Sequence, residues 1–466
     1  MTLSRRVARS LAALRERELP PEVAQAAALH FIDATGTALA AAGVSMGEAY
    51  RRYAANLPDG GRASLLARTG GTSASSAALV NGGLCHSLEY DDTHTGSIIH
   101  ASAVLMPAAL AVAEEVGASP AQMLGAYVRG YEFLVRVGRA APGGFQKKGF
   151  QVTPVAGVMA SALIAAELHG LDEDATVAAI GIALSQGSGV FEFLSNGSSV
   201  KSLHPGWAAH AGIIAAEFAK AGMTGPETAI EGKRGLFNVF VGDSAAIDRF
   251  AAELDDLGAV WRISEAAFKF SPCCHYLHPF IEALGLLAER GVTVDAVESL
   301  VCEVPLGADA VICEPWADKL AAPTGHSGRW SLPIVVASQL VEGRVDLETF
   351  ERPASAEVRA LAQRVSWRPL ENADFPNRFE AVVICKTKDG ASRTIRVEDA
   401  YGNHTRPPAP EEVLAKFRTN AAKSLTPDAA EALEIALRDM QGVPDLSRVT
   451  AALRAERRPC EGVSRS

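Results

Sequence analysis

The chain has 466 residues, of which 48% are apolar and 21% charged, and its formal net charge is −10. This length suggests two or more domains, and the composition is that of a globular protein with ample material for a core. The acidic balance and the lack of long runs of like charge argue against nucleic acid and anionic membranes as partners, although a local pocket can still bind an anionic substrate.

The N-terminal stretch, MTLSRRVARSLAALRERELP, has neither the apolar core nor the small-residue cleavage site of a secretory signal. Glu16 and Glu18 also argue against a transit peptide. No uninterrupted apolar stretch reaches about 18 residues, so the sequence predicts no membrane span. The seven scattered cysteines are an odd number, which favours a reducing compartment, the cytoplasm, over a disulfide scaffold.

The residues up to about position 260 are rich in alanine and predict mostly helices. Proline near a predicted first turn and glycine after the last turn mark several of the boundaries. Alanine and glycine let neighbouring helices approach closely, which is typical of a compact bundle. The predicted helices are Pro21–Ala41, Ala101–Val116, Pro120–Val137, Thr153–His169, Glu173–Gln186 and Pro205–Ala221.

The pattern changes after about Trp261. Val297–Leu306 is a strand-like run, and RFEAVVICKTKDGASRTIRVED predicts two strands joined by a turn at Asp389-Gly390. Helices are predicted between them, at Ser331–Leu340 and Ser355–Val365. This region therefore predicts a small α+β unit.

The helical pattern returns in the stretch PPAPEEVLAKFRTNAAKSL, which indicates that the C-terminal helices rejoin the first domain. The sequence as a whole therefore predicts a mostly α fold with two domains. The larger is an all-helical domain of residues 1–264 and 406–466, and the smaller is an α+β lid domain of residues 265–405.

The stretch HSLEYDDTHTGSIIHAS, His86–Ser102, gathers three histidines and three acidic side chains between nearly uncharged flanks. Histidine is the side chain most easily poised near neutral pH, so the cluster predicts proton transfer. The alternatives are a metal site drawn from its histidines and aspartates, and a polar loop in which Asp91 or Thr93 caps the next helix. The spacing matches neither HExxH nor paired CxxC motifs, and we predict no metal and no other cofactor.

A second polar stretch, SNGSSVKSLHPGWAAHAG, brings Lys201 and His204 to the start of a predicted helix. Free backbone N–H groups and a lysine at a helix start favour an anion. The alternative is a flexible surface loop with a solvated lysine. If Lys201 faces a cleft, we expect it to contribute little to folding.

Two more stretches carry basic residues near or within the predicted lid. FKFSPCCHYLHPF, at the change of pattern, offers Lys269 and His275, and pockets prefer such domain junctions. TGHSGRWSLP adds Arg329 ahead of a helix. The alternatives are small buried cysteines in the first stretch and a loop with a helix cap in the second.

Taken together, these stretches resemble the MmgE/PrpD family, which includes 2-methylcitrate dehydratase, cis-aconitate decarboxylase and iminodisuccinate epimerase. The resemblance runs along most of the chain, through LHFIDATGTALAA, NGGLCHSLEYDDTH with HAS and PAALAVAEE, KSLHPGWAAHAG, FKFSPCCHYLHP, RWSLPIVVASQL and VLAKFRTNA. Each block is short, and it is their order and spacing that make the chain similar to that family.

The resemblance implies a large helical domain with a smaller α+β lid, a homodimer, and cofactor-free chemistry on a small di- or tricarboxylate in a cleft between the domains. Carried over position by position, it implies catalytic roles for His100, Lys201, Lys269 and His275, beside Asp91 and Asp92. We expect the substrate to be contacted by His86, Gln151, His204 and Arg329.

Removing a proton next to a carboxylate creates an enediolate, whose extra negative charge must be neutralised by fixed cations and hydrogen-bond donors. Lys201, Lys269 and Arg329 suit this role. His100 and His275 suit a base and an acid, and an aspartate would orient an imidazole.

Three reactions share this first step. Loss of a β-hydroxyl gives dehydration, reprotonation on the other face gives epimerisation, and loss of a β-carboxylate, which breaks a different bond, gives decarboxylation. We predict a dehydratase of the 2-methylcitrate type. The alternatives are an epimerase of an iminodisuccinate-type substrate and then a cis-aconitate-type decarboxylase.

Two positions depart from the family pattern. Glu89 stands where many relatives have the first aspartate of HxxDFDDT, and Gln151 stands where decarboxylase-like members have a histidine. Glutamine does not shuttle protons at neutral pH, which disfavours decarboxylation and favours epimerisation. A non-enzymatic alternative is an inactive, metabolite-binding paralogue. The titratable groups kept at the catalytic positions argue against it.

Overall fold

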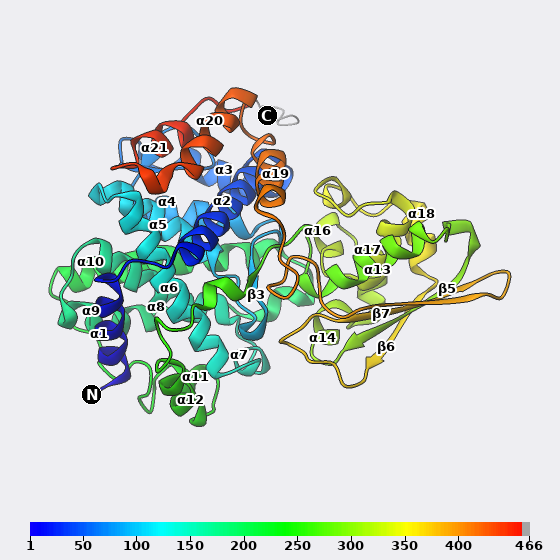
Figure 1. Cartoon of the computed structure of the whole chain (residues 1–466), viewed down its shortest axis with the longest axis horizontal. Coiled ribbons are helices and arrows are strands. Elements are labelled where there is room, and N and C mark those ends of the chain that lie inside the picture. Colours follow the sequence, from blue (N-terminus) through cyan, green and yellow to red (C-terminus); the bar gives the residue numbers. More distant parts are fainter. Residues whose placement is uncertain (459–466) are drawn as a thin grey trace. The chain divides into compact units, whose positions relative to one another are not determined.

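The computed structural model describes residues 1–458, so Cys460 lies outside the described residues. The chain forms two compact units: unit 1 comprises residues 1–193, 200–266 and 409 onward, and unit 2 comprises residues 194–199 and 267–408. Unit 1 is helical and unit 2 is α+β (Figure 1), which confirms the predicted fold class. The short segment 194–199 belongs to unit 2, although the chain on both sides of it belongs to unit 1.

Helices build almost all of unit 1, with short strands at β1 (Ala63–Ser64), β2 (Gly71–Thr72) and β3 (Thr93–His94). The helices are α1 (Leu3–Arg15), α2 (Pro21–Gly43), α3 (Glu48–Ala55), α4 (Ala74–His86), α5 (Ser102–Val116), α6 (Pro120–Ala140), α7 (Gly144–Lys147), α8 (Val152–Leu168), α9 (Glu173–Leu184), α10 (Leu203–Lys220), α11 (Leu236–Phe240), α12 (Ala245–Glu253), α19 (Pro410–Ala421), α20 (Pro427–Arg438) and α21 (Ser447–Leu453).

The six helices predicted for this region are confirmed as α2, α5, α6, α8, α9 and α10, with ends that differ by at most three residues. Local signals account for the boundaries. Ser119 caps α6 by accepting a hydrogen bond from the backbone N–H of Gln122, with Pro120 in the first turn. Gly117, with a φ of +72°, ends α5 in the left-handed conformation that glycine favours.

Glycine lets α4 and α10 approach closely. A Cβ atom added to Gly82 would lie 2.8 Å from the Cα of Gly206, and one added to Gly206 would lie 2.2 Å from the carbonyl oxygen of Leu79. Any larger side chain would push the two helices apart. This contact sets the start of α10, which carries His204, beside the end of α4, which carries His86.

The C-terminal helices complete unit 1, where α19 lies beside α2 (Figure 1). A Cβ atom added to Gly36 on α2 would lie 2.8 Å from the ring of Phe417 on α19, so this pair also packs closely. Lys416 on the same helix forms a buried ion pair with Asp33 of α2, with Nζ and Oδ1 2.8 Å apart. Two segments that are almost 400 residues apart in the sequence thus form one helix pair.

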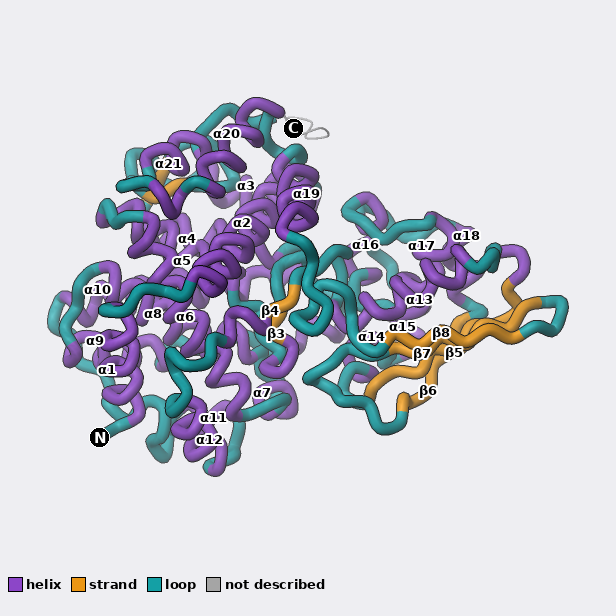
Figure 2. The backbone as a smooth tube through the Cα atoms, in the orientation of Figure 1, coloured by secondary structure: helices purple, strands orange, loops and turns teal. Residues whose placement is uncertain are grey.

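Unit 2 is built on a four-stranded sheet with the order β6-β5-β7-β8 (Figure 2). Its strands are β5 (Val297–Pro305), β6 (Val365–Leu370), β7 (Ala381–Thr387) and β8 (Ser392–Val397), and β4 (Ala266–Ala267) lies at its boundary with unit 1. Its helices are α13 (His278–Glu289), α14 (Asp309–Ile312), α15 (Trp316–Ala321), α16 (Gly325–Gly328), α17 (Leu332–Glu342) and α18 (Ala356–Ala362).

The hairpin predicted at Asp389-Gly390 is confirmed, since β7 and β8 pair antiparallel across that turn and Gly390 has a φ of +87°. Strand β5 and the helices α17 and α18 are also confirmed, except that α18 ends at Ala362 and Val365, predicted as its last residue, begins β6. Strand β6 was not predicted, because SWRPL contains Pro369, which disfavours a strand. It pairs parallel to β5 at the edge of the sheet, where proline is tolerated.

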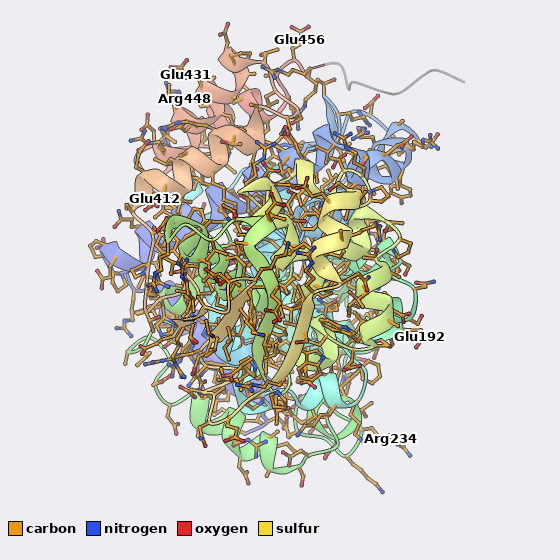
Figure 3. All side chains as sticks on the ribbon, turned by 90° about the vertical axis from the view of Figure 1, so that its right-hand side faces the viewer. Glu192, Arg234, Glu412, Glu431, Arg448 and Glu456 are labelled. Carbon is orange, nitrogen blue, oxygen red and sulfur yellow. The ribbon has the colours of Figure 1, made fainter. Side chains whose placement is uncertain are left out.

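Charged side chains of both signs lie at the surface (Figure 3). The labelled residues are all exposed: Glu192, Arg234, Glu412, Glu431, Arg448 and Glu456. Among residues 1–458, no single helix is long and apolar enough to cross a membrane; only the bent pair Pro21–Gly43 and Ser45–Ala55 meets the length and composition criterion when taken together.

Candidate active site

Helix α4 ends at His86, and the loop that follows folds back on it. Glu89 has a φ of +53°, a left-handed conformation that costs a residue with a Cβ atom about 1–3 kcal/mol. The bend brings His86, Asp91 and His100 together, with one nitrogen or oxygen atom of each lying within 4.8 Å of the others. We call these three residues the imidazole cluster.

Each imidazole of this cluster has its tautomer set by an acceptor on Nδ1. Nδ1 of His86 lies 2.8 Å from Oδ2 of Asp91, and Nδ1 of His100 lies 3.0 Å from the carbonyl oxygen of Asp92. Carboxylates and carbonyls only accept hydrogen bonds, so we assign the proton of both neutral rings to Nδ1 and the basic lone pair to Nε2. The ring centroids are 5.0 Å apart. His100 is 13% exposed and His86 is fully buried, so His100 is the more accessible base.

The side chain of Asp92 points away from the imidazole cluster. It accepts hydrogen bonds from the backbone N–H and hydroxyl of Ser102 and, at 3.0 Å, from the hydroxyl of Tyr131, and so caps the start of α5. Burial raises the pKa of Asp92 to about 7. Its backbone carbonyl, rather than its carboxylate, contacts His100. Of the two aspartates proposed to orient an imidazole, Asp91 contacts one of the cluster through its carboxylate. The Asp92 carboxylate instead lies 3.4 Å from Nδ1 of His30, which is outside the cluster.

Gln151, just before α8, bridges two histidines. Nδ1 of His204 donates to Oε1 of Gln151 at 2.8 Å, which turns the amide nitrogen of Gln151 toward Nε2 of His86, 3.5 Å away. Burial, and then the nearby His86 and Lys201, lower the pKa of His204 to about 4, so this ring is neutral at neutral pH. Gln151 is therefore held as a fixed, non-ionisable donor beside the imidazole cluster.

Lys201 forms a buried ion pair with Glu89. It lies in a short 3-10 turn, Ser199–Ser202, directly before α10, and its Nζ donates to Oε1 of Glu89. The side chains are only 7% and 3% exposed. The same Glu89 oxygen is 3.8 Å from Nε2 of His86, so the pair adjoins the imidazole cluster. The sequence identified Lys201 but not this partner, 112 residues earlier in the chain.

The remaining predicted residues, Lys269, His275 and Arg329, are buried and belong to unit 2. Nη1 of Arg329 donates to the carbonyl oxygen of Pro272 at 2.5 Å, and its guanidinium lies 4.7 Å from the ring centroid of Phe350. Arg329 thus supports the turn that precedes His275. The catalytic and binding roles of these three residues stay predictions.

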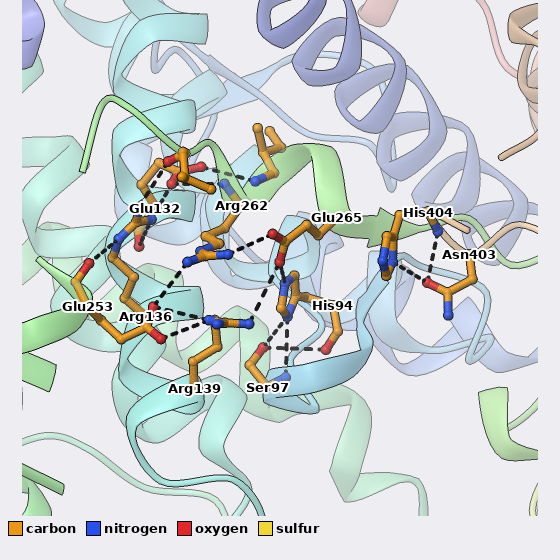
Figure 4. Close-up of polar contacts among 12 residues, drawn as sticks. His94, Ser97, Glu132, Arg136, Arg139, Glu253, Arg262, Glu265, Asn403 and His404 are labelled. Atoms are coloured by element: carbon orange, nitrogen blue, oxygen red, sulfur yellow. Dashed lines mark hydrogen bonds and ion pairs between the residues drawn. The ribbon is translucent and has the colours of Figure 1, made fainter. Parts of the chain in front are cut away.

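The remaining histidine of the stretch 86–102, His94, belongs to a separate ionic network (Figure 4). Its Nδ1 lies 2.9 Å from Oγ of Ser97, and its Nε2 lies 3.1 Å from Glu265. Although burial opposes ionisation, hydrogen bonds from His94 and Arg262 lower the pKa of Glu265 to about 2. This network joins the loop after β3 to the segment that follows α12 and accounts for His94 in structural terms.

The imidazole cluster also offers three donor atoms to a metal ion, the alternative raised by the sequence. However, ligands of one zinc ion lie about 2.0–2.2 Å from it and do not hydrogen-bond to each other through their ligating atoms. The direct contact between His86 and Asp91 instead favours a carboxylate that orients the imidazole ring.

We therefore expect the purified protein to hold no stoichiometric metal and to unfold at the same temperature before and after exhaustive EDTA treatment. A metal present at 100 times its Kd would add about 2.7 kcal/mol to the free energy of unfolding, and its removal would lower Tm by several degrees. Elemental analysis with differential scanning calorimetry checks this. One zinc or iron per chain, with a lower Tm after its removal, would contradict it.

Comparison with known families covers most of the chain. A family model described as the MmgE/PrpD N-terminal domain matches residues 5–247, and one described as the MmgE/PrpD C-terminal domain matches residues 271–441. The two matches leave only short segments at the ends and around the start of unit 2.

Individual relatives are more distant. The chain is 26% identical over 464 residues to a cis-aconitate decarboxylase-like protein, oryM, of Aspergillus oryzae, covering 95% of each chain. It is 27% identical over 403 residues to cis-aconitate decarboxylase of Homo sapiens, covering 82% of this chain and 80% of the human one. It is 24% identical over 455 residues to cis-aconitate decarboxylase of Aspergillus terreus, covering 92% and 91%.

Proposed function

Because the chain belongs to the MmgE/PrpD family, we propose that it is a lyase that acts on a small polycarboxylate. It removes the proton next to a carboxylate and then expels a β-hydroxyl, as a hydro-lyase of the 2-methylcitrate dehydratase type. The observation that carries this proposal is the imidazole cluster, in which an accessible histidine has its basic nitrogen fixed by the protein.

His100 is the base in this proposal. Its Nδ1–H donates to the backbone carbonyl of Asp92, which orients the ring and leaves Nε2 as the proton acceptor. The backbone N–H of His100 donates to Oγ1 of Thr153 at 3.1 Å, which fixes the residue from a second side. A base held in this way needs little reorganisation before it takes the proton.

Lys201 supplies positive charge for the enediolate. In the structure its ammonium is paired with Glu89. A substrate carboxylate that approaches Lys201 shares or displaces this partner. The electrostatic stabilisation by Lys201 is greatest when the substrate carries its extra negative charge, as the enediolate does. The contact therefore favours the transition state over the ground state.

The acid that protonates the leaving hydroxyl can come from the same side as the base. His86 is the neighbouring imidazole. To act as the acid it must enter the reaction doubly protonated, with its transferable proton on Nε2, and Asp91 on its Nδ1 stabilises that cation. The α and β carbons are bonded to each other, so two groups about 5 Å apart can act on both from one side. This arrangement predicts a syn elimination, whereas epimerisation requires groups on opposite faces.

The test is a panel of citrate, 2-methylcitrate, cis-aconitate and iminodisuccinate. Absorbance near the ultraviolet edge reports the new double bond, and proton NMR in D2O reports exchange at the α carbon. We expect dehydration of a hydroxylated member, with the proton and hydroxyl lost from one side when a stereospecifically deuterated substrate is used. An anti elimination would rule out His86 as the acid, and the absence of both double-bond formation and α-proton exchange with every member would overturn the function.

Epimerisation is the second candidate, and Gln151 is the observation that favours it. Held by His204 beside the imidazole cluster, Gln151 supplies a hydrogen-bond donor but no proton. The enediolate would then keep its β-substituent and take a proton back at the α carbon from an acid on the face opposite to His100. Chiral chromatography on the same panel separates this outcome from dehydration.

The names of the relatives also make decarboxylation an outcome to be tested. We expect wild-type protein to release little CO2 from cis-aconitate, and Gln151→His to raise that release at least tenfold, because a positioned acid contributes roughly a hundred- to ten-thousandfold. Gln151→Asn, which stays non-ionisable, is the matched control and should show no gain. Decarboxylation by wild type as fast as by Gln151→His would show that residue 151 does not decide the reaction.

A further inference from the structure

Lys416, on the C-terminal helix α19, reaches the loop that carries the acidic residues of the candidate site. Its Nζ donates to the carbonyl oxygen of Tyr90 at 2.8 Å and lies 3.9 Å from the centroid of the Tyr90 ring. The same ammonium pairs with Asp33 of α2, and the two side chains are 3% and 1% exposed. One buried cation therefore ties α2, α19 and this loop together.

The contact between Lys416 and Tyr90 matters because of where Tyr90 lies in the loop. Tyr90 lies between Glu89, which pairs with Lys201, and Asp91, which hydrogen-bonds to His86. Its carbonyl belongs to the peptide that joins it to Asp91, so a fixed carbonyl fixes the direction in which the chain enters Asp91. The preceding residue, Glu89, is in the left-handed conformation, which is unfavourable for a side chain with a Cβ atom and persists only where the surroundings impose it.

We propose that Lys416 is a positioning residue for the imidazole cluster. It acts through the Tyr90 carbonyl, which it holds so that Asp91 meets His86 and Glu89 meets Lys201. In this role it neither binds the substrate nor transfers a proton. The kinetic part of this inference rests on the proposed function, whereas the effect on the loop does not.

The test compares two variants that both lack the ion pair. Asp33→Asn removes the charge partner but leaves the Lys416 contact with Tyr90, and Asp33→Asn/Lys416→Met removes that contact as well. We expect Asp33→Asn to keep kcat within about threefold of wild type. The double variant should lose about a hundredfold in kcat, the cost of a misplaced catalytic group, with KM nearly unchanged. Asp33→Asn/Lys416→Arg, which keeps a cationic donor at position 416, should recover most of the lost kcat.

Hydrogen exchange separates the inference from the proposed function. Amides of residues 88–93 should exchange at least tenfold faster in the double variant than in Asp33→Asn, while those of α8 stay the same. If wild type turned over no polycarboxylate, the proposed function would fail. The exchange rates would still show whether Lys416 holds the loop in place.

Equal kcat and equal exchange in the two variants would overturn the inference, as would a loss confined to KM. The pH profile of kcat is a further measurement that a loss of stability alone would not change. We expect this profile to shift in the double variant, because the contact between Asp91 and His86 is then altered. If Asp33→Asn/Lys416→Met does not fold, Asp33→Asn/Lys416→Gln replaces it in the comparison. Its amide is one atom shorter and uncharged, and we expect at least a tenfold loss in kcat.

Discussion

Replacing His100 with asparagine is expected to lower kcat by about a hundred- to ten-thousandfold, the usual contribution of a general base. Asparagine places an amide N–H close to the position of Nδ1, so it can still donate to the Asp92 carbonyl, but it has no group in place of Nε2. The loss should therefore fall on proton transfer and leave the loop intact. Steady-state kinetics with the best substrate of the panel, and α-proton exchange in D2O, measure it.

The control is His94→Asn, in the same stretch of sequence. His94 contacts Ser97 and Glu265 in the ionic network, so its replacement should lower the free energy of unfolding while kcat stays within about threefold. A His100→Asn variant that exchanged the α-proton as fast as wild type would show that another group is the base.

Replacing Lys201 with alanine is expected to lower kcat/KM by roughly ten- to a hundredfold or more. A charged hydrogen bond in a partly dry site contributes about 1.5–3 kcal/mol, and 1.36 kcal/mol corresponds to one decade of rate. The loss should appear in kcat as well as in KM, because the ammonium also holds the enediolate, whose charge exceeds that of the substrate.

The structure changes the expectation for folding. The sequence suggested that Lys201 would matter little to stability, but its removal leaves the buried carboxylate of Glu89 without its cation. Breaking a buried pair in this way costs about 3–5 kcal/mol. We therefore expect Lys201→Ala to unfold at a clearly lower temperature than wild type.

The double variant Glu89→Gln/Lys201→Ala separates the two effects. It carries no unpaired charge, so its Tm should recover most of the loss, whereas its kcat/KM should stay as low as that of Lys201→Ala. Calorimetry and kinetics on the same preparations make the comparison. Recovery of both quantities together would mean that the single variant failed only because it was unstable, and it would remove Lys201 from the anion-binding role.

Much of the fold could be predicted from local sequence signals. Alanine-rich runs with serine, proline and glycine at their ends gave the six long helices, and Asp389-Gly390 gave the hairpin, because each signal acts within a few residues. Strand β6 was missed for the same reason. Its pairing with β5 overrides the local effect of Pro369, and that pairing is set by residues about 65 positions away.

The candidate site was predictable in part. The cluster of His86, Asp91 and His100 lies within fifteen residues, and its composition alone indicated proton transfer. The partners that set its geometry come from far away in the sequence. Glu89 meets Lys201 across 112 residues, and Tyr90 meets Lys416 across 326. No spacing rule connects such pairs, and only the packing of α4 on α10 and of α2 on α19 reveals them.

The joining of α19 to α2 has a consequence for the order in which the protein is made. A ribosome adds about 5–20 residues per second, so roughly 16–65 s pass between the synthesis of Tyr90 and that of Lys416, 326 residues later. Unit 2, which ends at residue 408, leaves the ribosome completely before α19 does. Until then α2 lacks the helix that packs on the face bearing Asp33, and this long-range closure must wait for the end of the chain. A message truncated after unit 2 would yield a chain with every residue of the imidazole cluster but without the helix that completes its support.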